Sequence, residues 1–379
     1  MFALLYFSQG AVLSFFTALN ALYLTSRGVS MSQVGIMGTI AMLPFILKIF
    51  LGMLSDRVNL RGWGHRKPYI LIGLLVQAAC LLLVMWVDPG RNFGLYVLLA
   101  FLLQTGMALY DTCTDGLALD TTPQEEEGTI QGLMVGGRAL GVVIVAGILG
   151  LVVDRLSWSA VFTGLALLTL IPLPLVLRVR EGARPARAAF DWKAFGAFKR
   201  WPIIALALLG ALYSLITNGA NQIVNPDLQL KFNISYTQAG FMTAVWGLGV
   251  VAGSLAGGRL TDRIGQRKSV LGAAAVSLLA VLGLAAMPSL GAAWALVALF
   301  GLAYGFYETV YFAVSMRATD PRIAASMFAL LMAVANIGTG IGLALSGTLV
   351  DALGYPLTFV ILAGLNLLVL PLVNAVFKK

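Results

Sequence analysis

The chain is built from apolar stretches that are each long enough to cross a bilayer. A helix needs roughly 20 apolar residues to span the hydrocarbon core, which is about 30 Å thick. Such runs recur throughout the sequence, and we expect twelve spans, at about 2–25, 33–54, 69–87, 94–120, 129–153, 159–177, 202–225, 237–258, 269–287, 292–316, 324–350 and 355–376. Only 11% of the residues are charged, too few to cover a water-soluble surface. Backbone groups in lipid must be hydrogen-bonded within their own segment, which predicts an all-α polytopic membrane protein.

Short motifs of the first half return in the same order about two hundred residues later. The repeated pairs are SMSQVG at 30–35 with SYTQAG at 235–240, DR at 56–57 with 262–263, YDT at 110–112 with YET at 307–309, and VDR at 153–155 with VDA at 350–352. This duplication predicts two six-helix bundles related by a parallel repeat, over 1–177 and 202–379, joined by a linker at 178–201. A parallel repeat in so apolar a chain is typical of a transporter with its substrate site between the halves.

The charges are distributed unevenly along the chain. Of 25 Lys and Arg residues, 19 fall on the side that holds both termini. The exceptions are Arg27, Arg91, Arg155 and Lys231 on the other side, and Lys48 and Arg138 within spans. This positive-inside pattern predicts that both termini are cytoplasmic, and we expect a multi-pass protein of the bacterial inner membrane. The net charge of +9 therefore reflects the orientation of the chain in the membrane and not nucleic-acid binding. We expect the basic linker to lie on lipid headgroups, where part of it can form a short amphipathic helix.

A loop motif identifies a family resemblance. Gly52-x-x-x-Asp56-Arg57, followed by Arg66 and Lys67, resembles the inner-loop motif of the major facilitator superfamily. The second copy consists of Gly258, Asp262, Arg263, Arg267 and Lys268. The resemblance covers the whole chain and implies the twelve-helix fold of that superfamily.

Two branches of the superfamily share further features with the chain. The long first loop, 56–69, is similar to that of glycoside–cation symporters. Residues 43–48 (LPFILK) and the run Asp115, Asp120, Pro123, Glu126 and Gly128 resemble muropeptide permeases and acetyl-CoA transporters.

The loop motif also has a physical interpretation. Asp56 can be neutralised by Arg57, Arg66 or Lys67, and Asp120 at the inner end of the fourth span can receive Arg57. We expect such ion pairs to act as a cytoplasmic gate that holds the halves in one state and opens in the other, without touching substrate. The alternative is that the basic residues only set topology and anchor the loops.

Five ionisable residues lie well inside predicted spans: Lys48, Asp111, Asp115, Arg138 and Glu308. Each costs at least about 2.5–3.5 kcal/mol at a span centre, so we expect them to face a bundle interior or a wet cavity. Counting about 1.5 Å per residue places Asp111 and Arg138 at one depth on consecutive spans, which predicts an ion pair. A second pair, Asp115 with Lys48, follows in the same way. The alternative for the first pair is a purely structural role.

The duplication singles out Glu308 in the tenth span. It corresponds to Asp111, whereas Arg138 corresponds to Asn336, so the second half keeps the acid and loses the base. A carboxyl without a base in a low dielectric can exchange a proton near neutral pH, which makes Glu308 our candidate for proton coupling. Tyr304, Tyr307 and Tyr311 lie beside it in the sequence. The alternative is a permanently protonated side chain that only bonds a neighbouring helix.

Polar stripes complete the candidate substrate site. Gln9 and Asn20 share a face of the first span, and Asn218, Asn221 and Gln222 lie on the seventh span, before an expected break at residues 225–226. The family resemblance implies that spans 1, 4, 7 and 10 line the central cavity. The alternative is that these amides join helices to one another.

Several function classes have no support in the sequence. His65 is the single histidine, so a histidine-based metal site or hydrolytic triad cannot be built, and no Walker-type phosphate loop is present. We therefore expect a monomeric secondary transporter that is not an enzyme and has no cofactor, with the proton as coupling ion. Its solute would be small and polar or amphipathic, anionic or zwitterionic because of Arg138 and Lys48, and imported. The alternatives are efflux by proton antiport and a non-transporting assembly factor with the same fold.

Overall fold

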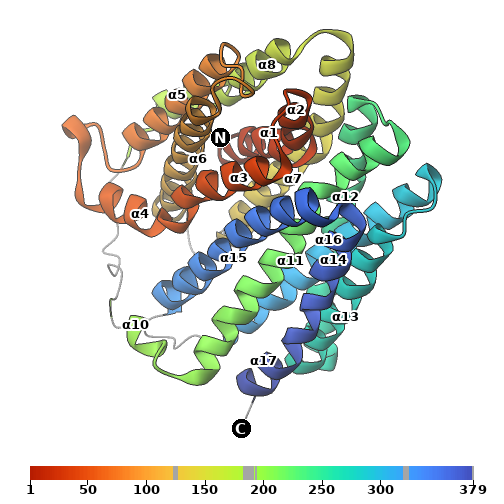
Figure 1. Cartoon of the computed structure of the whole chain (residues 1–379). Helices are drawn as coiled ribbons and strands as arrows, with labels where there is room; N and C mark the ends of the chain where they lie inside the picture. Colours follow the sequence, from red (N-terminus) through yellow and green to blue (C-terminus); the bar gives the residue numbers. More distant parts are fainter. Residues whose placement is uncertain (123–126, 182–191, 193, 319–323, 378–379) are drawn as a thin grey trace. The chain divides into compact units, whose positions relative to one another are not determined.

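The computed structural model describes residues 1–122, 127–181, 192, 194–318 and 324–377, which are helical apart from short connections (Figure 1). The first repeat contains α1 (Phe2–Ala18), α2 (Asn20–Ser26), α3 (Met31–Ile46), α4 (Lys48–Arg57), η1 (Leu60–Gly62), α5 (Lys67–Val84), α6 (Phe93–Thr121), α7 (Glu127–Arg155), α8 (Trp158–Leu170) and α9 (Leu173–Arg178). After α10 (Ala194–Ala197), the second repeat contains α11 (Trp201–Phe232), α12 (Tyr236–Ile264), α13 (Gln266–Ala285), α14 (Leu290–Ala318), α15 (Ala324–Leu353), α16 (Tyr355–Leu365), η3 (Asn366–Leu368) and α17 (Val369–Val376).

The helices of the described residues have the lengths that a membrane requires. Counting α3 with α4, α8 with α9, and α16 to α17 as continuous segments, eleven are long and apolar enough to cross a bilayer, and α1 with α2, bent by 46°, would make a twelfth. The predicted all-α polytopic class is confirmed. The expected break at residues 225–226 is wrong, because α11 continues through Pro226 to Phe232. Asn225 and Pro226 are both buried, and proline is tolerated inside membrane helices when neighbouring groups satisfy the freed carbonyl.

Several sequence predictions fall outside the described residues. Most of the linker does so, although Trp192 stacks on Phe195 of the short helix α10, with ring centroids 5.8 Å apart. Pro123 and Glu126, which belong to the resemblance to muropeptide permeases, also lie outside. The basic residues Arg322, Lys378 and Lys379 do as well.

The chain divides into two compact units. Unit 1 comprises Met1–Gly28, Ile40–Ala189 and Ser235–Ala244, and unit 2 comprises Val29–Thr39, Phe190–Ile234 and Val245–Lys379. Each unit thus includes a short helix start that belongs to the other sequence repeat. The division of the chain at residues 177 and 202 follows the repeat and stays a prediction.

Glycines allow each of these helix starts to pack closely inside its unit. A Cβ atom on Gly35 or Gly347, where α3 crosses α15 in unit 2, would lie 2.1–2.2 Å from a backbone oxygen of the facing helix. In unit 1, where α7 crosses α12, a Cβ atom on Gly150 or Gly240 would likewise lie 2.2 Å from a backbone oxygen of the facing helix. The duplication has therefore kept two equivalent backbone-to-backbone crossings.

Two repeated acids bind the same helix starts. In unit 2 the Asp351 carboxylate accepts hydrogen bonds from the backbone N–H groups of Met31 (3.1 Å) and Ser32 (2.7 Å). In unit 1 the Asp154 carboxylate accepts one from the N–H of Thr237 (2.8 Å). A Ser–Gln capping box satisfies further donors at each start. Carboxylates stabilise helix N-termini through the exposed donors and the helix dipole.

Candidate functional site

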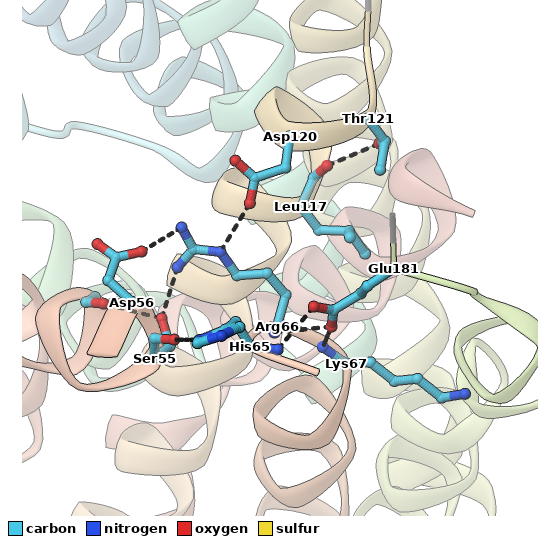
Figure 2. Close-up of polar contacts among 10 residues, drawn as sticks. Ser55, Asp56, His65, Arg66, Lys67, Leu117, Asp120, Thr121 and Glu181 are labelled. Carbon is cyan, nitrogen blue, oxygen red and sulfur yellow. Dashed lines mark hydrogen bonds and ion pairs between the residues drawn. The ribbon is translucent and has the colours of Figure 1, made fainter. Parts of the chain in front are cut away.

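A buried arginine lies at the centre of the first loop motif (Figure 2). The Arg66 guanidinium donates to Ser55 Oγ (2.6 Å) and forms ion pairs with Asp56 Oδ1 (2.5 Å) and Asp120 Oδ2 (3.2 Å). We call these four residues the arginine cluster. The side chains of Arg66 and Asp120 are each 7% exposed, whereas that of Asp56 is 49% exposed. A planar guanidinium suits this cluster because its donors can bind several oxygens at once.

The linker end of α9 is fixed to the same place. The Glu181 carboxylate accepts hydrogen bonds from the backbone N–H groups of His65, Arg66 and Lys67, just where α5 begins (Figure 2). In return, the Lys67 ammonium donates to two backbone carbonyls at the end of α9, 2.7 and 3.1 Å away. Each side chain thus satisfies the unpaired backbone groups of the other helix end. Glu181 was missed because its partners are backbone atoms, which leave no motif.

The predicted gating acids do come together, but on a different base. Asp56 and Asp120 both pair with Arg66, and the expected pairing of Asp120 with Arg57 is wrong, because Asp120 binds Arg66 and the Arg57 side chain is exposed. Arg66 immediately precedes α5, which packs along α6, and its side chain therefore reaches the inner end of α6. Gly52, in α4, lies against the Thr112 side chain.

The second copy of the motif is more exposed. Asp262 pairs with Arg317 at 3.2 Å, with side chains 73% and 59% exposed, and Arg267 donates to the Asn374 side chain. Arg317 occupies the position that corresponds to Asp120. Arg263 and Lys268 are exposed, and Gly258 is half-buried in α12. An exposed pair of this kind contributes little to stability.

A second cluster lies within the spans of unit 1. It consists of Tyr6 and Gln9 on α1, Lys48 at the start of α4, and Asp111 and Asp115 on α6, and we call it the acid cluster. Lys48 Nζ forms ion pairs with Asp111 Oδ2 and, at 3.3 Å, with Asp115 Oδ2. Gln9 Nε2 donates to Asp111 Oδ1 (2.9 Å), and the Tyr6 hydroxyl donates to Asp115 Oδ1.

Helix periodicity brings these side chains to one place. Tyr6 and Gln9 are three residues apart, and Asp111 and Asp115 are four apart, so each pair shares a helix face. Lys48 follows the interruption between α3 and α4 at Leu47 and is the first residue of α4, which packs beside α6. The cluster holds two carboxylates and one ammonium.

The structure confirms one of the two predicted intramembrane pairs. Asp115 does pair with Lys48, but the expected pair of Asp111 with Arg138 is wrong, because Asp111 binds Lys48 and Gln9 instead. Arg138 is exposed on α7, where its charge still influences Tyr6. α7 packs mainly on α1, and α6 mainly on α5 and α4, so consecutive helices are not the closest neighbours here.

The sequence candidates on α14 lie in a different environment. Glu308 is half-buried, and its charge acts on the buried Tyr213. The expectation that Glu308 has no partner is not supported, because its side chain interacts with other residues. Tyr307 and Tyr311 are fully buried, with ring centroids 5.3 and 5.0 Å from that of Tyr213. Both therefore belong to the core of unit 2.

The neutral candidates mainly connect helices. The Tyr304 hydroxyl donates to Asn218 Oδ1 (3.2 Å), and the Asn218 amide donates to Thr339 (3.3 Å), which joins α14, α11 and α15. Gln222 donates to the carbonyl of Leu343 (3.0 Å) on α15.

Three further candidates and one missed acid complete the set. In unit 1, Asn20 accepts a hydrogen bond from the Tyr96 hydroxyl, whereas Asn221 and Asn336 are half-buried in unit 2. Sequence reasoning missed Asp227, whose fully buried carboxylate pairs with Lys231 one turn later at 2.8 Å. Among the described residues, no group of three or more His, Cys, Asp or Glu side chains could hold a metal ion.

Comparison with known proteins identifies the class of this chain. The family model of the Major Facilitator Superfamily matches residues 2–224 and 206–379, and the chain therefore belongs to this superfamily of membrane transporters. The crystal structure of the nucleoside transporter NupG has the same fold, with a TM-score of 0.83 and 16% identity over 100% of this chain and 98% of that one.

The sequence relatives are transporters and not enzymes. A folate-biopterin transporter of Synechocystis is 29% identical over 180 residues, which are 47% of this chain and 36% of the relative, so the match spans about a third of that protein. The anhydromuropeptide permease of Escherichia coli K12 is 24% identical over 92% of this chain and 73% of the permease. The sialic acid transporter NanX of the same strain is 23% identical over 64% of this chain and 59% of the transporter. The chain is thus a multi-pass membrane protein with transporters of small solutes as relatives.

Proposed function

We propose that this protein is a proton-coupled symporter that moves a small polar organic solute across the bacterial inner membrane by alternating access. The observation that carries the proposal is the acid cluster, where two carboxylates share one ammonium within the spans of a transporter fold. Ionisable groups are costly inside a membrane and commonly mark ion or substrate pathways. The distribution of Lys and Arg supports cytoplasmic termini.

The charges of the cluster favour a solute that offers N–H donors. Lys48 already binds both Asp111 and Asp115, so one N–H donor of its ammonium remains and two carboxylates offset its positive charge. Asp115 is 34% exposed and can accept further hydrogen bonds from an amine, amide or aminopyrimidine. Of the basic residues that suggested an anionic solute, only Arg138 keeps that role. A zwitterionic or N–H-rich solute therefore fits the cluster better than a simple anion.

Transport assays on the purified protein in proteoliposomes test the proposal. Radiolabelled biopterin, folate, an anhydromuropeptide and sialic acid form the first panel, because the relatives are named for these solutes. We expect at least one of them to accumulate under an inward proton gradient and to stop accumulating when a protonophore collapses that gradient. Uptake that is indifferent to the gradient would contradict proton coupling, and failure of the whole panel would contradict the solute class.

A further inference from the structure

The two carboxylates of the acid cluster have chemically different partners. Asp111 forms an ion pair with Lys48 Nζ and accepts a hydrogen bond from Gln9 Nε2. The Lys48 ammonium has no acceptor for the hydrogen of a protonated carboxyl, and Gln9 could accept it only if its amide turned over to present Oε1 in place of Nε2. A proton on Asp111 would therefore compete with donors on both of its oxygens. The Asp111 side chain is also only 6% exposed, which restricts the approach of water.

Asp115 has a partner that can serve both protonation states. Its Oδ1 receives the Tyr6 hydroxyl, which is a donor to a carboxylate but can equally accept from a carboxylic acid after rotation about the C–O bond. Its Oδ2 lies 3.3 Å from Lys48 Nζ, whereas Lys48 lies closer to Asp111. The Asp115 side chain is 34% exposed. Asp115 is thus the more accessible and less firmly paired acid.

Charge counting gives the same assignment. One ammonium neutralises one of the two carboxylates, and two like charges that share a site favour uptake of a proton by one of them. Among the described residues, the charged and titratable groups that face Asp115 are Tyr6 on α1, Lys48 on α4 and Asp111 on α6, with Arg138 on α7 acting on Tyr6. None of these groups supplies a second positive charge in contact with Asp115.

We infer that Asp115 carries the coupling proton and that Tyr6 is the positioning residue that keeps it hydrogen-bonded in both states; this inference rests on the proposed proton-coupled transport. A hydronium ion transfers its proton to the Asp115 carboxylate and leaves as water, and the Tyr6 hydroxyl keeps its own proton but turns to accept from the new O–H group. The ion pair of Lys48 with Asp111 stays intact throughout. Release of the proton on the other side of the membrane restores the hydrogen bond from Tyr6.

Infrared spectroscopy of the purified protein tests the assignment without a substrate. As the pH falls, a protonated carboxyl adds a carboxylic-acid C=O stretching band, and ¹³C-labelled aspartate shifts that band only if it arises from an aspartate. We expect the shifted band in the wild type and in Glu308→Gln, and its loss in Asp115→Asn. The Glu308→Gln variant is the matched control, because it makes the same change from carboxyl to amide in unit 2. Persistence of the band in Asp115→Asn, or its loss in Glu308→Gln, would overturn the assignment.

A second variant keeps the test decisive if Asp115→Asn does not fold. Tyr6→Phe removes only the hydroxyl, and we expect the midpoint of the same band to move by about one pH unit, because the hydrogen bond to the carboxylate is stronger than the one that accepts from the neutral acid. An unchanged midpoint would refute the role of Tyr6.

Transport assays separate this inference from the proposed function. With a solute that the wild type accumulates, Asp115→Asn should lose accumulation driven by the proton gradient but keep exchange of labelled for unlabelled solute. Gradient-driven accumulation by folded Asp115→Asn would refute the inference and leave the proposed function standing. Absence of proton-driven uptake in the wild type would refute the proposed function, while the infrared titration would still decide which carboxyl binds the proton.

Discussion

Replacing Arg66 by methionine should destabilise the protein more than any equivalent change in the same loop. The substitution keeps a long side chain but removes the guanidinium that binds Ser55, Asp56 and Asp120. Asp120 is 7% exposed, so its buried carboxylate would lose the ion pair with Arg66. Removing one partner of a buried ion pair typically costs about 3–5 kcal/mol.

The other two contacts add less to this cost. Asp56 is about half-exposed, and water screens such a pair to a contribution of about 0–1 kcal/mol. The hydrogen bond to Ser55 contributes about 1 kcal/mol net. We therefore expect Arg66→Met to lower the free energy of unfolding by about 3–5 kcal/mol, with Asp120 as the main cause. Arg66→Lys should cost less, because it keeps the charge but loses the planar fork.

Reversible unfolding in mixed detergent micelles measures this difference. Arg57→Met is the matched control, since Arg57 belongs to the same motif but is exposed, and its change should stay within about 0.5 kcal/mol. In a double-mutant cycle, Asp120→Asn should cost much less in the Arg66→Met background than in the wild type. Equal effects of the Arg66 and Arg57 substitutions would refute the conclusion that the buried ion pair stabilises the fold.

Three further predictions concern packing and charge elsewhere. Gly240→Ala should lower the melting temperature because its Cβ would lie 2.2 Å from a backbone oxygen, an overpacking that typically costs about 1–3 kcal/mol, whereas Gly164→Ala, with open space around it, should not. Asp351→Asn should weaken the start of α3 and cost about 0.3–1 kcal/mol in the same melting assay, less at high salt. Lys48→Met would leave the carboxylate of Asp111 buried without its ion-pair partner and should reduce the yield of folded protein on size-exclusion chromatography, whereas an unchanged yield would show that the acid is held neutral.

Hydrophobic run length predicted the helices well, because a membrane leaves the chain few other choices. The loop motif likewise predicted that Asp56 and Asp120 bind basic residues of the loop, and Arg66 was among those expected for Asp56. Residue depth, however, could not identify the partner of Asp111, since depth along a helix says nothing about which helix faces it. α6 packs on α4 and α5 and not mainly on α7, which brings Lys48 to Asp111 in place of Arg138.

The duplication also explains why proton binding should be confined to one repeat. Helix starts and glycine crossings are equivalent in the two repeats, so the same packing constraint applies to both. The chemistry has diverged: at the offsets of the repeat, Lys48 corresponds to Ser254 and Asp115 to Phe312, and of these three positions only Asp111 keeps an acidic counterpart, Glu308. At these positions the second half therefore has neither the ammonium nor the second carboxylate of the acid cluster. Two carboxylates beside one ammonium leave an excess negative charge, and this charge favours proton uptake. Replacing Asp115 by Asn should therefore abolish proton coupling, whereas replacing Glu308 by Gln should not.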